Sequence, residues 1–188
     1  LISFRIESDD RVSLLHSPYP GMVGFFRNTY ARANPGRPPL GDSKKAAFKA
    51  SNQKYVVAEN GGGGVVNANR DQALSWETFT IERTRRGDLT SGELVNIKAP
   101  NGQHYVVAEE RGGGAVNANR TAPFNWERFV IDGWENDVTR LARGKPLPNG
   151  SVVTLRTDGD FYLRPESGVL KATGTSPDAS AKFVLELK

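Results

Sequence analysis

Hydrophobic and polar residues alternate in short runs along most of this chain, and the apolar members are mainly Val, Ile, Phe and Tyr. A period of two is typical of a half-buried β-strand. Dipeptides such as Asn101-Gly102 and Asn149-Gly150 separate the runs, and Asn-Gly is a strong turn signal. No window keeps an apolar i, i+3, i+4, i+7 stripe long enough to predict a helix. The pattern therefore predicts an all-β fold, with its first four strands near residues 46–50, 54–58, 65–69 and 77–82.

An internal repeat organises most of the chain. Residues 55–81 return as residues 105–131 without a gap, and 17 of these 27 positions are identical. The shared segments are Tyr-Val-Val-Ala-Glu, Val-Asn-Ala-Asn-Arg and Trp-Glu-x-Phe-x-Ile. A third copy keeps mainly the apolar positions, in Phe161-Tyr-Leu163, Val169-Leu-Lys-Ala172 and Phe183-Val-Leu185. Self-similarity at a fixed period indicates repeated structural units, which we place at about residues 42–91, 92–148 and 149–188.

Three repeats of about four strands each favour a closed barrel, because closure leaves few strand edges open and propellers typically have at least four blades. The order of Lys-Tyr-Val-Val-Ala-Glu, a Gly-rich turn, Val-Asn-Ala-Asn-Arg and Trp-Glu-x-Phe-x-Ile resembles fascin-like β-trefoil repeats. It is most similar to the bacterial β-trefoil carbohydrate-binding modules of that superfamily, which are often attached to glycoside hydrolases. The resemblance covers residues 42–188. It implies a pseudo-threefold β-trefoil that binds a polysaccharide, with a β-glucan as the expected ligand, in a secreted protein.

The N-terminal segment, residues 1–41, lies outside the repeat. Apolar and polar residues alternate over 2–6 as in a half-buried strand, and a turn at 8–10 could lead into the apolar stretch at 11–15. Residues 34–39, Asn-Pro-Gly-Arg-Pro-Pro, predict an extended linker. This extension could be the tail of an upstream domain or a small flap packed on the trefoil.

Composition narrows the class of protein only moderately. The chain has 188 residues, with 24% charged and 37% hydrophobic residues, as in globular proteins. The absence of cysteine excludes disulfides, thiolate nucleophiles and Cys-based zinc sites. No apolar run approaches the roughly 20 residues that a membrane helix needs. The chain begins at Leu1 without a basic-then-apolar leader, so we expect a mature or excised fragment.

The charge balance is slightly basic. The chain has 25 Lys and Arg against 21 Asp and Glu, and its formal net charge is +4. The densest cluster is Arg83, Arg85 and Arg86, which could bind phosphate or could form an ordinary solvated face. We expect the solvated face, and neither nucleic acid nor membrane as a partner.

Two Trp-Glu pairs are the sharpest candidates for ligand contact: Trp76-Glu77 and Trp126-Glu127. An indole face is flat and apolar and can stack on the C–H face of a sugar. A neighbouring carboxylate can accept hydrogen bonds from sugar hydroxyls. The alternative is that each Trp plugs an end of the barrel and each Glu accepts a backbone amide near the start of a strand.

A second candidate set is polar. If Val66 and Ala68 face the core, alternation turns their neighbours outward, and amide and guanidinium groups bind hydroxyls well. Alternatively, Asn could serve a tight turn, and Arg could pair with the acid at the end of Tyr-Val-Val-Ala-Glu. This set consists of Glu59, Asn67, Asn69 and Arg70 in the first repeat, and Glu109, Asn117, Asn119 and Arg120 in the second.

Two further sequence patterns are weaker candidates for a functional site: the glycine runs and the paired glutamates. The Gly61–Gly64 and Gly112–Gly114 runs lack the Lys-Ser/Thr of a phosphate loop, so tight turns that allow close backbone approach explain them better. A glycosidase pair could be built from Glu59 and Glu77, but its exact duplication in the second repeat would require two copies of one active site. We therefore expect no catalytic residues, and no cofactor or metal either.

These observations predict a non-catalytic carbohydrate-binding module. The third repeat places Ser180-Ala181 opposite Trp126-Glu127, so we expect two binding sites per chain, in the first and second repeats. The alternatives are a protein-interaction module of the actin-bundling fascin type, and a C-terminal accessory domain of a glycoside hydrolase.

Overall fold

The computed structural model describes residues 3–6, 12–16 and 41–188. Strands β1 (Ser3–Ile6) and β2 (Val12–His16) pair antiparallel, as the alternation in the N-terminal segment predicts. The turn expected at 8–10 and the linker expected at 34–39 lie outside the described residues. No helix in the described part of the chain is long and apolar enough to cross a membrane.

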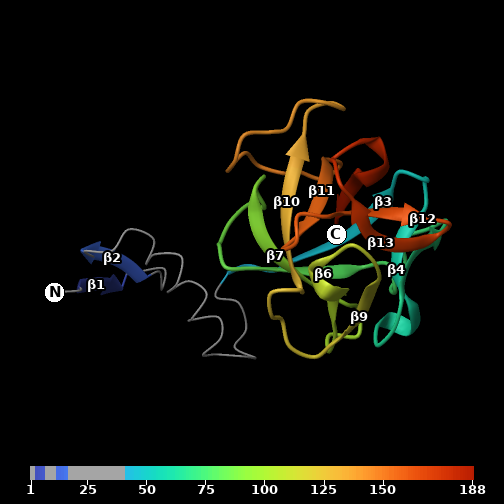
Figure 1. Cartoon of the computed structure of the whole chain (residues 1–188), viewed down its shortest axis with the longest axis horizontal. Helices are drawn as coiled ribbons and strands as arrows, with labels where there is room; N and C mark the ends of the chain where they lie inside the picture. The colour runs from blue at the N-terminus through green and yellow to red at the C-terminus, as the bar shows by residue number, and fades with distance from the viewer. Residues whose placement is uncertain (1–2, 7–11, 17–40) are drawn as a thin grey trace.

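Residues 41–188 contain twelve strands, four in each predicted repeat (Figure 1). The first repeat holds β3 (Lys44–Ala50), β4 (Tyr55–Ala58), β5 (Val66–Arg70) and β6 (Phe79–Arg83). The second holds β7 (Glu93–Lys98), β8 (Tyr105–Ala108), β9 (Val116–Arg120) and β10 (Arg128–Trp134). The third holds β11 (Val152–Thr157), β12 (Tyr162–Glu166), β13 (Val169–Gly174) and β14 (Phe183–Leu187). Short 3₁₀ turns, η1 (Glu59–Gly61), η2 (Glu109–Arg111) and η3 (Ala179–Ala181), complete the units.

The first and fourth strands of every unit close a barrel. The antiparallel pairs run β3–β6, β6–β7, β7–β10, β10–β11, β11–β14 and back from β14 to β3. Closure satisfies both edges of every barrel strand, so these strands present no open edge to solvent.

The second and third strands form hairpins that meet at one end of the barrel. β13 pairs with β5, and isolated bridges join Val65 to Asn117 and Ala115 to Lys171. Each hairpin starts in the same register, which is the sign of threefold symmetry: the pairs are Lys49–Tyr55, Lys98–Tyr105 and Arg156–Tyr162. The fold is therefore a pseudo-threefold β-trefoil, as predicted.

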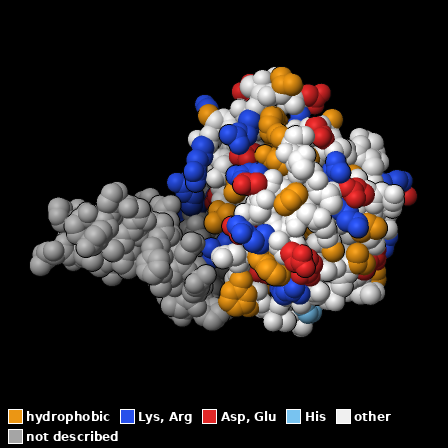
Figure 2. Space-filling model, viewed as in Figure 1, with side chains coloured by type: hydrophobic (Ala, Val, Ile, Leu, Met, Phe, Trp, Pro, Cys, Tyr) orange, Lys and Arg blue, Asp and Glu red, His pale blue; other side chains and the backbone are white. Residues whose placement is uncertain are grey.

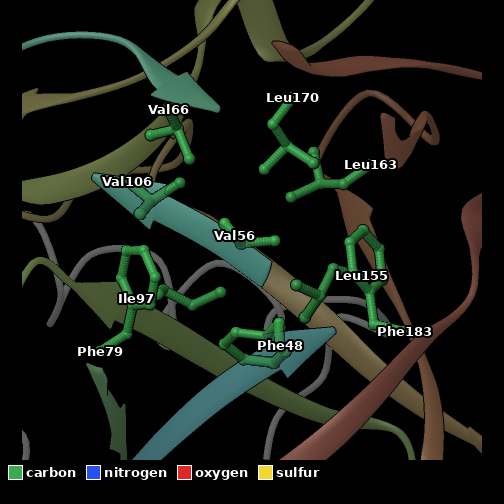
Figure 3. Close-up of a pocket in the computed structure, with 10 residues that line it drawn as sticks. All are labelled: Phe48, Val56, Val66, Phe79, Ile97, Val106, Leu155, Leu163, Leu170 and Phe183. Carbon is green, nitrogen blue, oxygen red and sulfur yellow. The ribbon is translucent and has the colours of Figure 1, made fainter. Parts of the chain in front are cut away.

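Apolar residues from all three units fill the space between barrel and hairpins (Figure 3). Phe48, Phe79 and Phe183 are at most 2% exposed and lie in contact as tilted or edge-on ring pairs. The space left among the core side chains is about 10 Å³, too little for more than one water. The barrel axis is thus a packed core, and it needs no tryptophan as a plug.

The two glycine runs bind each unit to the next. Gly63 N donates to Ala118 O (2.7 Å) and Ala118 N donates to Gly64 O (2.7 Å). The same exchange joins the second run to Ala172, and Gly168 of the third unit accepts from Ala68 N of the first. A Cβ at Gly62 would lie 2.9 Å from the Cβ of Ala99, so only glycine permits this approach. The prediction of tight turns with close backbone approach is confirmed.

The arginine cluster noted in the sequence is divided between core and surface. Arg83 is 1% exposed, and its guanidinium donates to Glu93 Oε1 (2.9 Å) and to the carbonyls of Gly87 (2.7 Å) and Asp88 (2.6 Å). Arg85 and Arg86 remain exposed. The cluster is therefore not one solvated face, because a buried ion pair across two units uses one of its three members.

Candidate functional site

Trp76 and Trp126 occupy equivalent positions in the loops that lead into β6 and β10. Their backbone carbonyls accept hydrogen bonds from Ala58 N (3.2 Å) and Ala108 N (3.0 Å), which ties each loop to its own hairpin. The side chains are 44% and 38% exposed. A tryptophan that plugged the barrel would be buried, so the structure excludes that alternative and leaves two indole platforms on the surface.

Each platform has an apolar neighbour that sequence reasoning missed. Leu74 is 65% exposed and Phe124 is 51% exposed, two residues before Trp76 and Trp126. Their signal was present in the sequence, because both are large apolar residues in otherwise polar loops and they recur at the repeat's spacing of 50. The two loops therefore expose apolar surface at symmetry-related positions.

The predicted polar residues of the first unit do come together, but they bind one another. Glu59 Oε1 accepts from Asn67 Nδ2 (2.7 Å) and Glu59 Oε2 accepts from Arg70 Nη2 (2.7 Å). Arg70 also donates to Asn69 Oδ1 (2.5 Å), and its Nε lies 3.9 Å from Glu77 Oε1. As predicted, Val66 and Ala68 face the core, which turns Asn67 and Asn69 outward.

The second unit repeats this network bond for bond. Glu109 accepts from Asn117 Nδ2 (2.9 Å) and Arg120 Nη2 (2.6 Å), and Arg120 donates to Asn119 Oδ1 (2.7 Å). Arg120 Nε lies 3.8 Å from Glu127 Oε1. Because the same bonds form in two units, the network is a common structural feature of the first and second repeats.

Glu77 and Glu127 serve the backbone. They are 4% and 2% exposed, and their Oε2 atoms accept from Leu74 N (2.9 Å) and Phe124 N (2.7 Å). Burial is the largest influence on Glu127 and raises the pKa of its carboxyl, against the opposing effects of the Phe124 amide and Arg120. The structure thus favours the backbone-bonding alternative for both residues, with each carboxylate fixing the loop that carries the adjacent Trp.

A groove lies beside the first platform. Its volume is about 390 Å³, and the residues that line it come from the single loop between β5 and β6 and its flanks: Arg70, Asp71, Gln72, Leu74, Ser75, Trp76 and Glu77. Asp71, Gln72 and Ser75 are exposed there, so the groove presents hydroxyl, amide and carboxylate groups together with the indole. This arrangement can hold a polar ligand that has one flat apolar face.

The third unit keeps the scaffold and lacks the platform. Pairing of Tyr162 with Gly174 and of Arg164 with Lys171 puts Lys171, Thr173 and Gly174 at the positions of Asn117, Asn119 and Arg120. In the loop before β14, Asp178 Oδ1 accepts from Ser180 N (2.8 Å), which replaces the Glu-to-amide bond of the other units. Glu166 retains the position of Glu109, a match that sequence reasoning missed because the turn that follows Glu166 is three residues shorter.

Residues 41–188 contain one histidine, His104. No group of three or more His, Cys, Asp or Glu side chains in residues 3–6, 12–16 and 41–188 could hold a metal ion. The imidazole of His104 lies 2.8 Å from the Asn101 amide, where the glycine run of the first unit meets the second.

Comparison with solved structures supports the fold. The chain is similar to a designed threefold-symmetric protein, ThreeFoil, at 12% identity with a TM-score of 0.55, over 77% of this chain and 97% of that one. It is also similar to an SDF2-like protein from Arabidopsis thaliana (10% identity, TM-score 0.58, 76% and 92% covered). A protein of unknown function from Caenorhabditis elegans matches at 10% identity with a TM-score of 0.60, again over 76% and 92%. No protein-family model and no curated protein sequence matches the chain. At these identities the likeness concerns the fold alone.

Proposed function

We propose that this protein is a non-catalytic carbohydrate-binding module that recognises a polysaccharide through the loops carrying Trp76 and Trp126. The observation that carries the proposal is the pair of symmetry-related indoles, 44% and 38% exposed, each held by a buried carboxylate beneath its loop. An indole that is fixed before binding loses little conformational entropy when a sugar ring stacks on it.

The polar contacts of such a site come from the rim rather than from the internal network. In the first unit Asp71, Gln72 and Ser75 are exposed in the groove that Trp76 lines, where they can reach sugar hydroxyls. Glu59 and Arg70 already bind each other, so their role is to hold the hairpin in shape. Two platforms on one chain suit a polymer, because the second contact becomes effectively intramolecular.

The resemblance to bacterial β-trefoil carbohydrate-binding modules of the fascin-like superfamily supports the choice of ligand. On that resemblance we propose a β-glucan as the polysaccharide, secretion as the destination, and attachment to a glycoside hydrolase as one context. Hydrolysis by this chain is not part of the proposal, because the arrangement of Glu59, Arg70 and Glu77 recurs in the second unit, and a catalytic pair would therefore require two copies of one active site. Purified protein should accordingly release no reducing ends from any polymer that it binds.

The test is binding of a soluble β-glucan by the parent chain and by the double variant Trp76→Ala/Trp126→Ala. We expect the affinity to fall at least tenfold, on the scale of about 1–3 kcal/mol for losing a large aromatic contact. Trp134→Phe is the matched control, since Trp134 donates to Thr154 on the barrel wall and lies away from both loops. Unchanged binding by a double variant with a native circular dichroism spectrum would refute the proposal.

A protein-interaction module of the fascin type is the second candidate, and Leu74 is the observation that favours it. A leucine that is 65% exposed offers a protein partner an apolar contact, whereas sugars stack on flat rings. Leu74→Ser discriminates the two: it should leave β-glucan binding nearly unchanged if the first proposal holds. Capture of a defined partner, actin filaments included, that is lost in Leu74→Ser and kept in Trp76→Ala would favour the second.

A further inference from the structure

The charges of the trefoil are distributed unevenly between its two ends. We use "loop end" for the end opposite the hairpins, where segments 41–45, 84–92, 135–151 and residue 188 connect the barrel strands. Residues 41–188 contain 20 Lys and Arg against 18 Asp and Glu. The loop end carries eight of these basic residues, Lys44, Lys45, Arg85, Arg86, Arg140, Arg143, Lys145 and Lys188, but only four acidic ones, Asp42, Asp88, Glu135 and Asp137. Its net charge is therefore +4, and the rest of the trefoil, including both Trp loops, carries −2.

Two loops of the loop end, residues 84–92 and 135–151, are joined by backbone hydrogen bonds. Ser91 N donates to Lys145 O (2.8 Å), Gly144 N donates to Ser91 O (2.8 Å), and the side chain of Arg143 lies against Gly92. On the other side of the first loop, Asp42 N donates to Arg85 O (3.1 Å). Figure 2 shows Lys and Arg side chains gathered along this side of the trefoil. We use "basic strip" for Arg85, Arg86, Arg143 and Lys145.

The basic strip stands on a rigid support. Buried Arg83 donates to the carbonyls of Gly87 and Asp88, which fixes the loop that carries Arg85 and Arg86. Glu93 neutralises the charge of Arg83, so the buried pair supports the loop and leaves the net charge of the surface unchanged. All four side chains of the strip are exposed, and none forms an ion pair with a described residue.

The sequence that leads into this end is also basic. Residues 17–40 contain Arg27, Arg32 and Arg37 and not a single Asp or Glu. The described chain resumes at Gly41, whose amide donates to Arg83 O (3.2 Å) at the loop end. This segment and the loop end therefore both carry more basic than acidic residues.

We propose that the basic strip binds the acidic groups of an anionic polysaccharide, at a surface separate from the Trp loops. Guanidinium groups bind carboxylate or sulfate through paired hydrogen bonds, and three of the four residues are Arg. The segments that make up the loop end contain no Trp, Tyr or Phe, so they lack the stacking surface used for single-stranded nucleic acid.

The geometry allows one polymer to reach both surfaces. β6 runs from the Trp76 loop to the Arg85 loop and has five residues, which span roughly 17 Å at about 3.3 Å per residue. The choice of a polysaccharide rather than another polyanion rests on the proposed function. The inference that the basic strip binds a polyanion is independent of the proposed function.

The test compares a polyuronate with a neutral β-glucan of similar length, using the whole chain. We expect Arg85→Gln/Arg86→Gln/Arg143→Gln/Lys145→Gln to lose at least tenfold in polyuronate affinity at low salt, with a flatter salt dependence because fewer counterions are released. The matched control, Lys49→Gln/Arg111→Gln/Arg156→Gln/Lys171→Gln, removes the same charge from the hairpin half and should lose less than threefold. Should the quadruple variant fail to fold, Arg85→Gln/Arg86→Gln alone should lose about threefold.

The outcomes separate this inference from the proposed function. Loss of polyuronate binding with retained β-glucan binding supports the basic strip, and it does so even if the Trp variants show that the glucan binds elsewhere. Equal losses in the strip variant and the control variant would overturn it, because net charge would then explain the effect. Tighter binding to duplex DNA than to polyuronate at the same salt concentration would overturn the polysaccharide as its ligand.

Discussion

The first two units and the third share one backbone and differ in what they show to solvent. All three hairpins start in the same register, and the inward positions Phe79, Phe129 and Phe183 are at most 1% exposed. At the position of Trp76 and Trp126 the third unit has Ser180. Folding therefore constrains the inner face of each unit, while the loops before β6, β10 and β14 are free to diverge.

The turn between the hairpin strands shows the same division. Five residues separate Glu59 from Val65, whereas Ser167 and Gly168 alone separate Glu166 from Val169. In both the long and the short turn a backbone carbonyl accepts a hydrogen bond from a neighbouring unit: Gly64 O accepts from Ala118 N, and Gly168 O accepts from Ala68 N. The long glycine loops thus exceed what closure of the trefoil needs. In the first unit the longer loop brings Gly61 close to the indole of Trp76: a Cβ at Gly61 would lie 3.7 Å from Trp76 Cδ1.

The largest expected effect tests whether the long glycine loops are as constrained as this comparison implies. Gly62 has φ +132°, and a Cβ there would lie 2.7 Å from Asn101 Nδ2 and 2.9 Å from the Ala99 Cβ. Gly62→Ala should lower the free energy of unfolding by about 3 kcal/mol, from backbone strain and overpacking together. Chemical denaturation measures this loss.

Gly64→Ala is the matched control in the same loop, since a Cβ at Gly64 would have no neighbouring atom within 4 Å and the φ of this residue is not left-handed. It should change the free energy of unfolding by less than about 0.5 kcal/mol. Similar effects of the two substitutions would show that the loop is loose and that its glycines are not needed for close approach.

The second prediction counts the sites. Titration calorimetry with a short oligosaccharide should give two sites per chain, and either Trp76→Ala or Trp126→Ala should remove one, each loss being worth about 1–3 kcal/mol at that site. A stoichiometry of three, or a sugar bound beside Ser180 in a crystal, would contradict the division between units.

Sequence reasoning anticipated the fold well because the core is periodic. Val66, Ala68, Phe79 and Ile81 sit on the inner face as alternation requires, and the repeat fixes their equivalents. It could not anticipate which polar residues are free to bind a ligand. Glu77 and Asp71 are both acids in one loop, yet the first is 4% exposed and the second points its carboxylate to Lys54 at the surface. Only three-dimensional contacts distinguish them.

The residues that sequence reasoning missed have a different cause. Leu74 and Phe124 differ from each other, so identity between the repeats did not mark them, although both are large and apolar. Glu166 was hidden by the shorter turn, which changes the spacing between the halves of the hairpin from that of the second unit. Leu74 and Phe124 could have been found by comparing residue type rather than residue identity between the repeats, and Glu166 by allowing a change of turn length in the third.

The third prediction distinguishes, within the first unit, a residue that stabilises the loop from a residue that contacts the ligand. Glu77→Gln weakens the bond to Leu74 N and the attraction to Arg70 in a buried setting, so the free energy of unfolding should fall by about 1–2 kcal/mol. Affinity for the β-glucan should stay within twofold of the parent. Trp76→Ala should show the reverse, with a large loss of affinity and a small change in stability. A Glu77→Gln variant that keeps its stability but no longer binds the β-glucan would show that Glu77 contacts the ligand.

The smallest effect concerns the pH dependence of stability. Burial raises the pKa of Glu127 above its ordinary value of 4.5, so the folded chain holds this proton more tightly than the unfolded chain does. The contribution of Glu127 to the free energy of unfolding is therefore most favourable below about pH 4.5, and it declines as the pH rises through the raised pKa. In Glu127→Gln this decline is absent, although a constant loss from the weaker bond to Phe124 N remains. The stability of the variant relative to the parent should consequently improve from pH 4 to pH 7, as urea denaturation at several pH values would measure.

Glu135→Gln, which removes one exposed charge on the loop end, should follow the parent's profile. A variant that gains on the parent as the pH falls would mean that the hydrogen bond and Arg120 outweigh burial, and that this carboxylate is held charged beneath the Trp126 loop.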